Sequence, residues 1–278
     1  MATKQQIAEL WQTVFHDSDE FINLFFSRVY KPENTLSIEH GGKVISALQM
    51  VPYEMKIVDK TVPMAYVCGV CTLPSEQGKG YMKKLMQQAM DTMQQRGFAL
   101  TTLIPAEPWL FDFYKKFGYT HLIHNGTEIH QANETISEPA HYTIEPCTGK
   151  EAFDYFNRKQ RERKCAVLHN AFDFETVRLD CIADEGNCWL AREKNLPVGI
   201  AFESLNSDNH LIIKEILSNQ ISVKNTLIQF LLKHHNTQTA RVRVSATSSN
   251  NAQTYASACI FDKTITKLPE ACLSLMLD

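Results

Sequence analysis

The residues best suited to chemistry in this chain form a short glycine-bearing turn, Gln77 to Met82, between an expected strand and an expected helix. Gly78 and Gly80 permit the backbone to turn its amides outward and to approach a ligand closely. Free N–H groups at a helix N-terminus attract anions, and Lys79 and Lys83 add positive charge nearby. The turn therefore predicts a pyrophosphate site.

The spacing of this turn excludes two common phosphate loops. Neither G-x-x-x-x-G-K-[ST] nor G-x-G-x-x-G is present. Two glycines beside a lysine-bearing helix face are also what an ordinary tight turn contains. The phosphate interpretation therefore depends on the elements around the turn.

Those elements are a strand before the turn and a helix after it. Tyr66 to Leu73 is rich in Val, Cys, Thr and Tyr and is followed by Pro74, which predicts a buried strand. From Gly80 to a natural end at Gly97, apolar residues recur at spacings of three and four. The members of this apolar stripe are Met82, Leu85, Met86, Ala89, Met90 and Met93.

The pattern V-x-x-L-P-x-x-Q-G-x-G after the strand, together with PWLFDFYKKFGY downstream, resembles the GNAT superfamily of acyl-CoA-dependent N-acetyltransferases. Gln77 and Gly80 match the first two fixed positions of the family signature [RQ]-x-x-G-x-[GA], whereas Met82 departs from the third. The subgroup that looks most similar is the tandem-domain enhanced-intracellular-survival type, in which Leu often stands at that position. A counterpart of that subgroup's sterol-carrier-like C-terminal domain is not expected in this shorter sequence.

The resemblance implies an acetyl-CoA site and direct transfer of the acetyl group to a primary amine. Residues of the turn would hold the pyrophosphate, namely Gln77, Gly78, Lys79, Gly80, Tyr81 and Met82. The two central parallel strands of the family splay apart around the thioester. Backbone groups of Val70, Cys71 and Thr72 would then pair with the pantetheine arm.

Tyr114 occupies the position of the family's general acid, in the pattern Y-x-[KR]-x-G-[FY]. The resemblance implies that it returns a proton to the CoA thiolate, which a phenol that is protonated at neutral pH can do. Its aromatic neighbours on a short expected helix would otherwise favour a packing role. No general base is assigned, because the acids suggested by chain location alone are ordinary surface residues by type: Glu39, Glu54, Glu107 and Asp112.

Length and composition predict a soluble, cytoplasmic protein of two domains. The 278 residues exceed the usual size of one domain, and the net charge of -3 argues against nucleic acid as a partner. No apolar run is long enough to span a membrane, and the first residues lack the apolar core of a signal peptide. The sequence leaves the oligomeric state open and is compatible with an oligomer.

Neither the cysteines nor the histidines predict a metal site. The eight cysteines are dispersed, which predicts reduced and mostly buried thiols. Cys68 and Cys71 form a CxxC pair, but odd spacing on a strand is expected to point their side chains to opposite faces. His234 and His235 are adjacent on an expected helix and face different directions. We therefore expect no metal cofactor.

The remaining pattern predicts an α/β fold of two tandem GNAT-like domains, each a mixed, mostly antiparallel sheet with flanking helices. Two opening helices, Thr3 to Phe15 and Ser18 to Tyr30, precede five strands and two helices in the order β-β-β-α-β-α-β. In the family two helices at this place flank the acceptor cleft. Aromatic residues of the second helix are candidates for its lining, although a core role is favoured for each of them: Phe21, Phe25, Phe26 and Tyr30.

A polar stretch at residues 132–139 predicts a linker between a catalytic domain, 1–135, and a second domain, 140–278. The second half repeats the order of the first, which indicates an internal duplication. Ser218 to Ser222 stands where the first half has its glycine turn and contains no glycine. The second domain is therefore expected to lack a cofactor site.

The sequence thus favours an acetyl-CoA-dependent N-acetyltransferase that acts on a small-molecule or peptide amine. Two alternatives remain open: a non-catalytic CoA-binding regulatory or scaffolding protein, and a nucleotide-phosphate binder that uses the same helix terminus. Neither the acceptor nor the preferred acyl chain can be read from the sequence.

Overall fold

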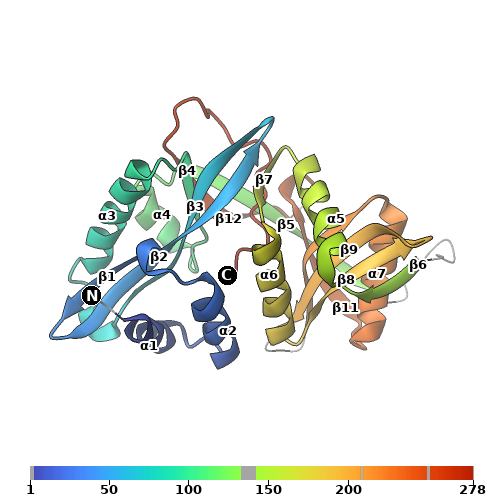
Figure 1. Cartoon of the computed structure of the whole chain (residues 1–278), viewed down its shortest axis with the longest axis horizontal. Helices are drawn as coiled ribbons and strands as arrows, with labels where there is room; N and C mark the ends of the chain where they lie inside the picture. Colours follow the sequence, from blue (N-terminus) through green and yellow to red (C-terminus); the bar gives the residue numbers. More distant parts are fainter. Residues whose placement is uncertain (1–2, 133–141, 207, 209, 249–250, 278) are drawn as a thin grey trace. The chain divides into compact units, whose positions relative to one another are not determined.

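The computed structural model describes residues 3–132, 142–206, 208, 210–248 and 251–277, and the chain forms two compact units. The first unit comprises Met1–Ile123 and Tyr255–Leu268, and the second comprises His124–Thr254 and Pro269–Leu277. Each unit has a mixed, mostly antiparallel sheet with flanking helices, which confirms the predicted fold class (Figure 1). The predicted linker lies, apart from Ala132, outside the described residues.

After the opening helices the chain follows the predicted order β-β-β-α-β-α-β, although most of the last of these strands, β5 (His121–Gln131), belongs to the second unit. The strands of the first unit are ordered β1-β2-β3-β4-β12 in the sheet. The helices are α1 (Lys4–Phe15), α2 (Asp19–Leu24), α3 (Tyr81–Gln95) and α4 (Trp109–Lys115). The strands are β1 (Thr35–His40), β2 (Lys43–Ile57), β3 (Lys60–Thr72), β4 (Leu100–Leu103) and β12 (Gln253–Ile260).

The two opening helices begin at the residues that the sequence favours as caps. The Thr3 hydroxyl accepts a hydrogen bond from the Gln6 N–H, and the Gln6 side chain returns one to the Thr3 N–H, which completes a capping box. Ser18 accepts from the Phe21 N–H at the start of α2. The expected single helix to Tyr30 is instead interrupted, because α2 passes into a π-helical turn, η1 (Phe25–Val29).

A β-bulge distorts the long hairpin of β2 and β3. Ala47 pairs with Cys71 and Gln49 pairs with Cys68, so one more residue stands on β3 than on β2 between these pairs. Gly69 lies in the bulge with φ +58°, and a Cβ atom at this position would lie 2.2 Å from the Trp11 ring. Glycine suits this position for two reasons: the backbone is left-handed, and α1 approaches too closely to leave room for a Cβ atom.

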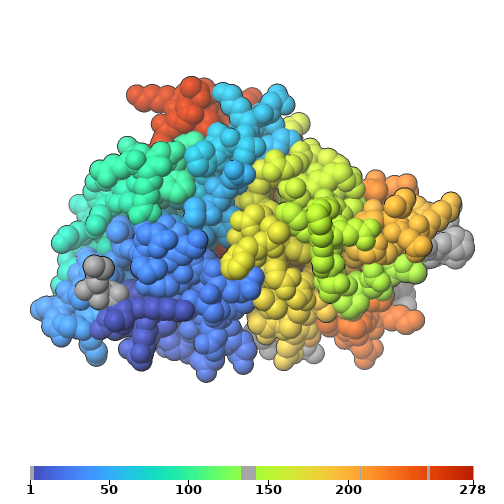
Figure 2. All heavy atoms as spheres, viewed as in Figure 1, coloured from blue at the N-terminus to red at the C-terminus, as the bar shows by residue number. Residues whose placement is uncertain are grey.

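The parallel strands β3 and β4 pair over only three residues, from Met64 with Leu100 to Tyr66 with Thr102. Beyond Tyr66, β3 runs on to Thr72 while it pairs with β2 alone among the described strands. The helix α3 packs its apolar stripe on these strands, and Leu48, Val67, Met86 and Met93 are buried there. Figure 2 shows the outer, polar face of α3 in teal at the left of the molecule.

The second unit carries a sheet of order β5-β11-β10-β9-β8-β6. The strands of this unit are β5 (His121–Gln131), β6 (Tyr142–Pro146), β7 (Cys165–Leu168), β8 (Asn187–Glu193), β9 (Leu196–Leu205), β10 (Leu211–Ser218) and β11 (Thr239–Ser245). Its helices are α5 (Gly149–Glu162), α6 (Ala171–Ala183) and α7 (Ile221–His234). The strands β7 and β12 were not predicted, and the other elements lie within a few residues of the predicted ones.

Candidate functional site: a glycine turn and an open strand edge in the first unit

The glycine turn leads into a helix whose first amides have no protein partner inside the helix. Gly78 and Gly80 have φ values of +77° and +84°, and open space surrounds the positions that their Cβ atoms would take. Gly80 is the N-cap of α3 and offers no side-chain cap. The first backbone bond of the helix runs from the Lys84 N–H to the Gly80 carbonyl, 3.1 Å. The three preceding N–H groups therefore remain available to an anion.

Side chains around the turn fix its shape. Gln77 donates from its side-chain amide to the Thr72 carbonyl at 3.3 Å, which ties the turn to the end of β3. Lys79 pairs with Glu76 at 2.9 Å, so part of its charge is already neutralised. Lys83 is exposed on the first turn of α3. A pyrophosphate would thus meet backbone amides first and lysine charge second.

The divergence of β3 and β4 leaves Cys71 and Thr72 paired with β2 only, and Val70 in the bulge, within the described part of the sheet. Backbone N–H and C=O groups on the opposite side can accept an extended chain as a further strand would. The residues predicted to meet pantetheine therefore lie at the open edge of β3, and this edge leads into the glycine turn.

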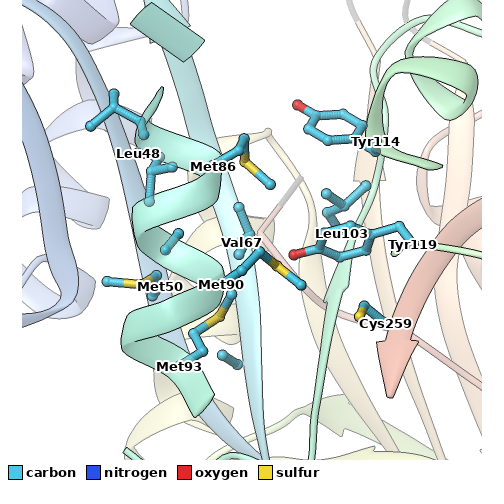
Figure 3. Packing of buried hydrophobic residues seen from close by; sticks show 13 residues of the cluster. Leu48, Met50, Val67, Met86, Met90, Met93, Leu103, Tyr114, Tyr119 and Cys259 are labelled. Atoms are coloured by element: carbon cyan, nitrogen blue, oxygen red, sulfur yellow. The ribbon is translucent and has the colours of Figure 1, made fainter. Parts of the chain in front are cut away.

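Tyr114 lies on α4, 5% exposed, within the same cluster as the α3 methionines. Figure 3 shows it level with Met86, in the N-terminal half of α3, with its hydroxyl directed toward that helix. Burial raises the pKa of Tyr114 to about 12, because the phenolate would lose hydration. Among the described residues its hydroxyl has no hydrogen-bond partner, whereas the Tyr119 hydroxyl contacts Thr101 Oγ1 at 3.1 Å.

Residues 2–122 match the family model described as acetyltransferase (GNAT) domain. This segment is a GNAT acetyltransferase domain. The family match covers the strand, the glycine turn, α3 and Tyr114 together. No protein of curated function matches the chain significantly. No helix among the described residues is long and apolar enough to cross a membrane.

Solved structures resemble nearly the whole chain. A conserved protein of Enterococcus faecalis V583, titled a probable N-acyltransferase, has a TM-score of 0.76 at 15% identity and covers 95% of this chain and 72% of its own. A GCN5-related N-acetyltransferase of Anabaena variabilis has a TM-score of 0.72 at 18% identity, with coverage of 92% and 70%. Eis1 from Mycobacterium abscessus has a TM-score of 0.67 at 11% identity, with coverage of 94% and 73%. At these identities the likeness is one of fold.

One prediction within the GNAT domain is wrong. Cys68 and Cys71 were expected on opposite faces of the strand, but their partners Gln49 and Ala47 lie two residues apart and so share a face. The bulge at Gly69 adds a residue between the cysteines and reverses the alternation. Both cysteines are free, and burial raises the pKa of Cys71 to about 12, so this thiol is protonated and a poor nucleophile.

The acids suggested by chain location are all exposed: Glu39, Glu54, Glu107 and Asp112. The structure therefore offers no buried carboxylate at these positions to act as a base. Phe25 and Phe26 are buried in the core, 1% and 4% exposed, where they pack with Trp11. Phe21 and Tyr30 are partly exposed and remain accessible to a ligand.

Most of the thiols are buried, as the sequence predicts. All eight cysteines are free, and six of them are buried. Within the described residues no group of three or more His, Cys, Asp or Glu side chains could hold a metal ion. His235 lies 3.1 Å from the carboxylate of Glu203, and His234 stacks on Phe230, so both contact their own unit.

Two features of the GNAT domain escaped the sequence reasoning. The bulge at Gly69 had a signal, because a lone glycine inside a strand pattern often marks a bulge or a close backbone approach. The buried amide of Gln49 had none, since a glutamine in an apolar strand does not reveal which neighbours its side chain finds.

Proposed function

We propose that the GNAT domain binds acetyl-CoA and transfers its acetyl group directly to a primary amine. One observation carries this proposal. The parallel strands β3 and β4 separate directly before an uncapped helix N-terminus with two open glycines. An extended pantetheine arm fits the open strand edge, and a pyrophosphate fits the helix terminus that follows.

In this reaction the amine nitrogen attacks the thioester carbon, the C–N bond forms and the C–S bond breaks. Tyr114 would donate its phenolic proton to the departing thiolate, and the proton lost by the amine would pass to water. The raised pKa of Tyr114 keeps the donor protonated at neutral pH. Direct transfer is favoured over an acyl-cysteine intermediate, because the nearby Cys71 thiol is buried and protonated.

We further propose that the second unit, which contains most of the predicted domain 140–278, is a degenerate copy without a cofactor site. Its strands β10 and β11 also pair in parallel over three residues, from Leu211 with Ala240 to Ile213 with Val242. The turn before α7 is engaged by its own unit, since the Asn219 N–H donates to the Val198 carbonyl at 2.9 Å and its side chain accepts from Tyr155 at 3.1 Å.

Release of free CoA thiol from acetyl-CoA, measured with a panel of primary amines, tests the activity. We expect at least one amine to raise the rate well above hydrolysis without amine, with the N-acetylated product visible by mass spectrometry. Tight acetyl-CoA binding without amine-dependent release would favour the alternative, a CoA-binding regulatory or scaffolding protein. Displacement of CoA by ATP at equal concentration would favour a nucleotide site.

A further inference from the structure

A buried side-chain amide lies on the face of β2 opposite the face that packs on α3. Gln49 is 1% exposed, and its Nε2 atom has no hydrogen-bond partner. Its neighbours Leu48 and Met50 pack with the α3 cluster, so the alternation of the strand points Gln49 away from it. A buried polar group without a partner is costly, and it indicates a missing ligand or a strained site.

Hydrogen bonds hold the Gln49 side chain at its other terminal atom, Oε1. Thr35 Oγ1 lies 2.6 Å from Gln49 Oε1 and 2.9 Å from the Lys31 carbonyl, and it also bonds the Tyr30 hydroxyl. A hydroxyl has one proton and two lone pairs. Its one proton satisfies the contacts with Lys31 and with Gln49 together only if Thr35 donates to the Lys31 carbonyl and accepts from the amide.

That arrangement requires the Gln49 amide to be flipped, so that its nitrogen and oxygen exchange positions. The NH₂ group then donates to Thr35. The oxygen then becomes the buried atom without a partner. An unpaired carbonyl oxygen requires an N–H or O–H donor, and a primary amine or ammonium group supplies one. The hydrogen-bond count thus identifies the chemistry of the missing partner as a donor.

The position of Gln49 in the sheet suits a role in binding the amine that accepts the acetyl group. Gln49 pairs with Cys68, two residues beyond the point at which β3 leaves β4 and one residue before the Gly69 bulge. Thr35, which contacts the amide, and Cys68, which pairs with Gln49, are each partly exposed. Tyr30 directly follows the π-helical turn η1, a type of irregularity that is frequent at functional sites.

We propose that the Gln49 side chain receives the amine of the acceptor, and that Tyr30 and Thr35 hold it in position. This inference rests on the proposed function and names the group that orients the substrate. The amine donates an N–H to the Gln49 oxygen, which leaves its lone pair free to face the thioester. The role concerns the acceptor only, so acetyl-CoA binding is independent of it.

The test is Gln49→Met, which keeps the length of the side chain and removes its polar end. Steady-state kinetics are measured with spermidine, tyramine and Nα-acetyl-lysine amide, using whichever amine the parent acetylates. We expect the KM for the amine to rise about 10- to 100-fold, the worth of a hydrogen bond to a charged group. The KM for acetyl-CoA and the rate of acetyl-CoA hydrolysis without amine should not change.

Thr35→Val removes the hydroxyl that holds the amide and should raise the amine KM by a smaller factor, whereas Thr35→Ser should keep the parental value. The matched control is Gln160→Met in the second unit, because Gln160 is equally buried at 1% and also has an Nε2 atom without a partner. Gln160→Met should leave the KM for the amine and the KM for acetyl-CoA unchanged.

A parental amine KM in Gln49→Met would overturn the inference while the proposed function stands. An equal rise in both KM values would also overturn it, since that result indicates a general disturbance of the domain. If Gln49→Met does not fold, Thr35→Val is the deciding variant. A parental KM for the amine in Thr35→Val would overturn the inference. A parent that acetylates none of the amines overturns the proposed function and this inference with it.

Discussion

At the residue scale, Tyr114 combines burial with a hydroxyl that has no partner among the described residues. A pKa near 12 makes the phenol a weak acid, but a proton donor needs only to hold its proton until charge develops on the leaving sulfur. The nearby Tyr119 differs, because its hydroxyl is already bonded to Thr101. The two tyrosines therefore form a natural pair for separating chemistry from packing.

We predict that Tyr114→Phe lowers kcat by about 10²- to 10⁴-fold, the usual worth of one positioned acid. The change removes only the hydroxyl, so the fold and the affinity for acetyl-CoA should be retained. Thiol release under saturating acetyl-CoA and amine measures the effect. The matched control, Tyr119→Phe, should keep kcat near the parental value, and parental kcat in Tyr114→Phe would make that residue structural.

Buried thiols predict a loss of stability at alkaline pH. Burial raises the pKa of Cys71, Cys165 and Cys181 from 9.0 to about 12. Above pH 9 the unfolded chain loses these protons while the folded chain keeps them, so the free energy of unfolding falls as pH rises from 9 toward 12. Each thiol contributes a slope of about 1.4 kcal/mol per pH unit in that range.

Urea unfolding at pH 7.5, 8.5, 9 and 10 measures this slope. We expect little change between pH 7.5 and 8.5 and a falling midpoint above pH 9. Cys181→Ala lacks one buried thiol, and its midpoint should fall less steeply than that of the parent. A midpoint that is constant up to pH 10 would contradict the buried, protonated state of these cysteines.

At the element scale, the bulge of β3 depends on a glycine in contact with α1. We predict that Gly69→Ala destabilises the protein, because a left-handed alanine costs about 1–2 kcal/mol and the clash with Trp11 adds about 1–3 kcal/mol. Gly41→Ala is the control, since Gly41 has φ +59° but open space around its Cβ position. Thermal unfolding should show a clearly larger loss for Gly69→Ala, and equal losses would mean that the Trp11 contact is unimportant.

The elements that the sequence predicts well are those with strong local signals. The apolar stripe of α3 and its flanking glycines, Gly80 and Gly97, mark that helix closely. The strand β12 has mainly small and polar residues, so its pairing with β4 depends on a partner that is distant in sequence. Propensity and periodicity do not report such non-local contacts.

The same division applies to the site. The glycine turn and the position of Tyr114 follow from local motifs, so the sequence indicates both. The face of β3 on which Cys68 and Cys71 lie does not follow from a local motif, because one extra residue in a bulge reverses the alternation of side chains. The environment of Gln49 depends on Thr35 in another strand, which only the folded chain brings within hydrogen-bond distance.

At the scale of the whole molecule, the two units repeat one topology with different turns before their central helices. In both units a parallel strand pair is limited to three residues. One strand of that pair, β3 or β10, carries a bulge where it pairs with its antiparallel hairpin partner. The first turn has Gly78 and Gly80 in open space, and the second begins α7 at Gln220 with its backbone extended. The two units therefore share a sheet arrangement and differ in the turn before the central helix.

We predict that each chain binds one acetyl-CoA. Native mass spectrometry of the whole chain, titrated with acetyl-CoA, counts the bound molecules directly. Saturation at one per chain is expected, because the turn before α7 lacks glycine and its Asn219 groups are already hydrogen-bonded. Saturation at two equivalent molecules per chain would show that the second unit keeps a cofactor site.

Isothermal titration of acetyl-CoA into the parent and into Gly80→Glu tests the central claim most directly. The glutamate places bulk and negative charge where the pyrophosphate would meet the start of α3, so binding should be lost. Gly97→Glu is the matched control, because Gly97 at the other end of α3 also has a positive φ, +77°, and open space. The account predicts parental affinity in Gly97→Glu and no measurable binding in a folded Gly80→Glu. Parental affinity in both variants would contradict an acyl-CoA site at the glycine turn.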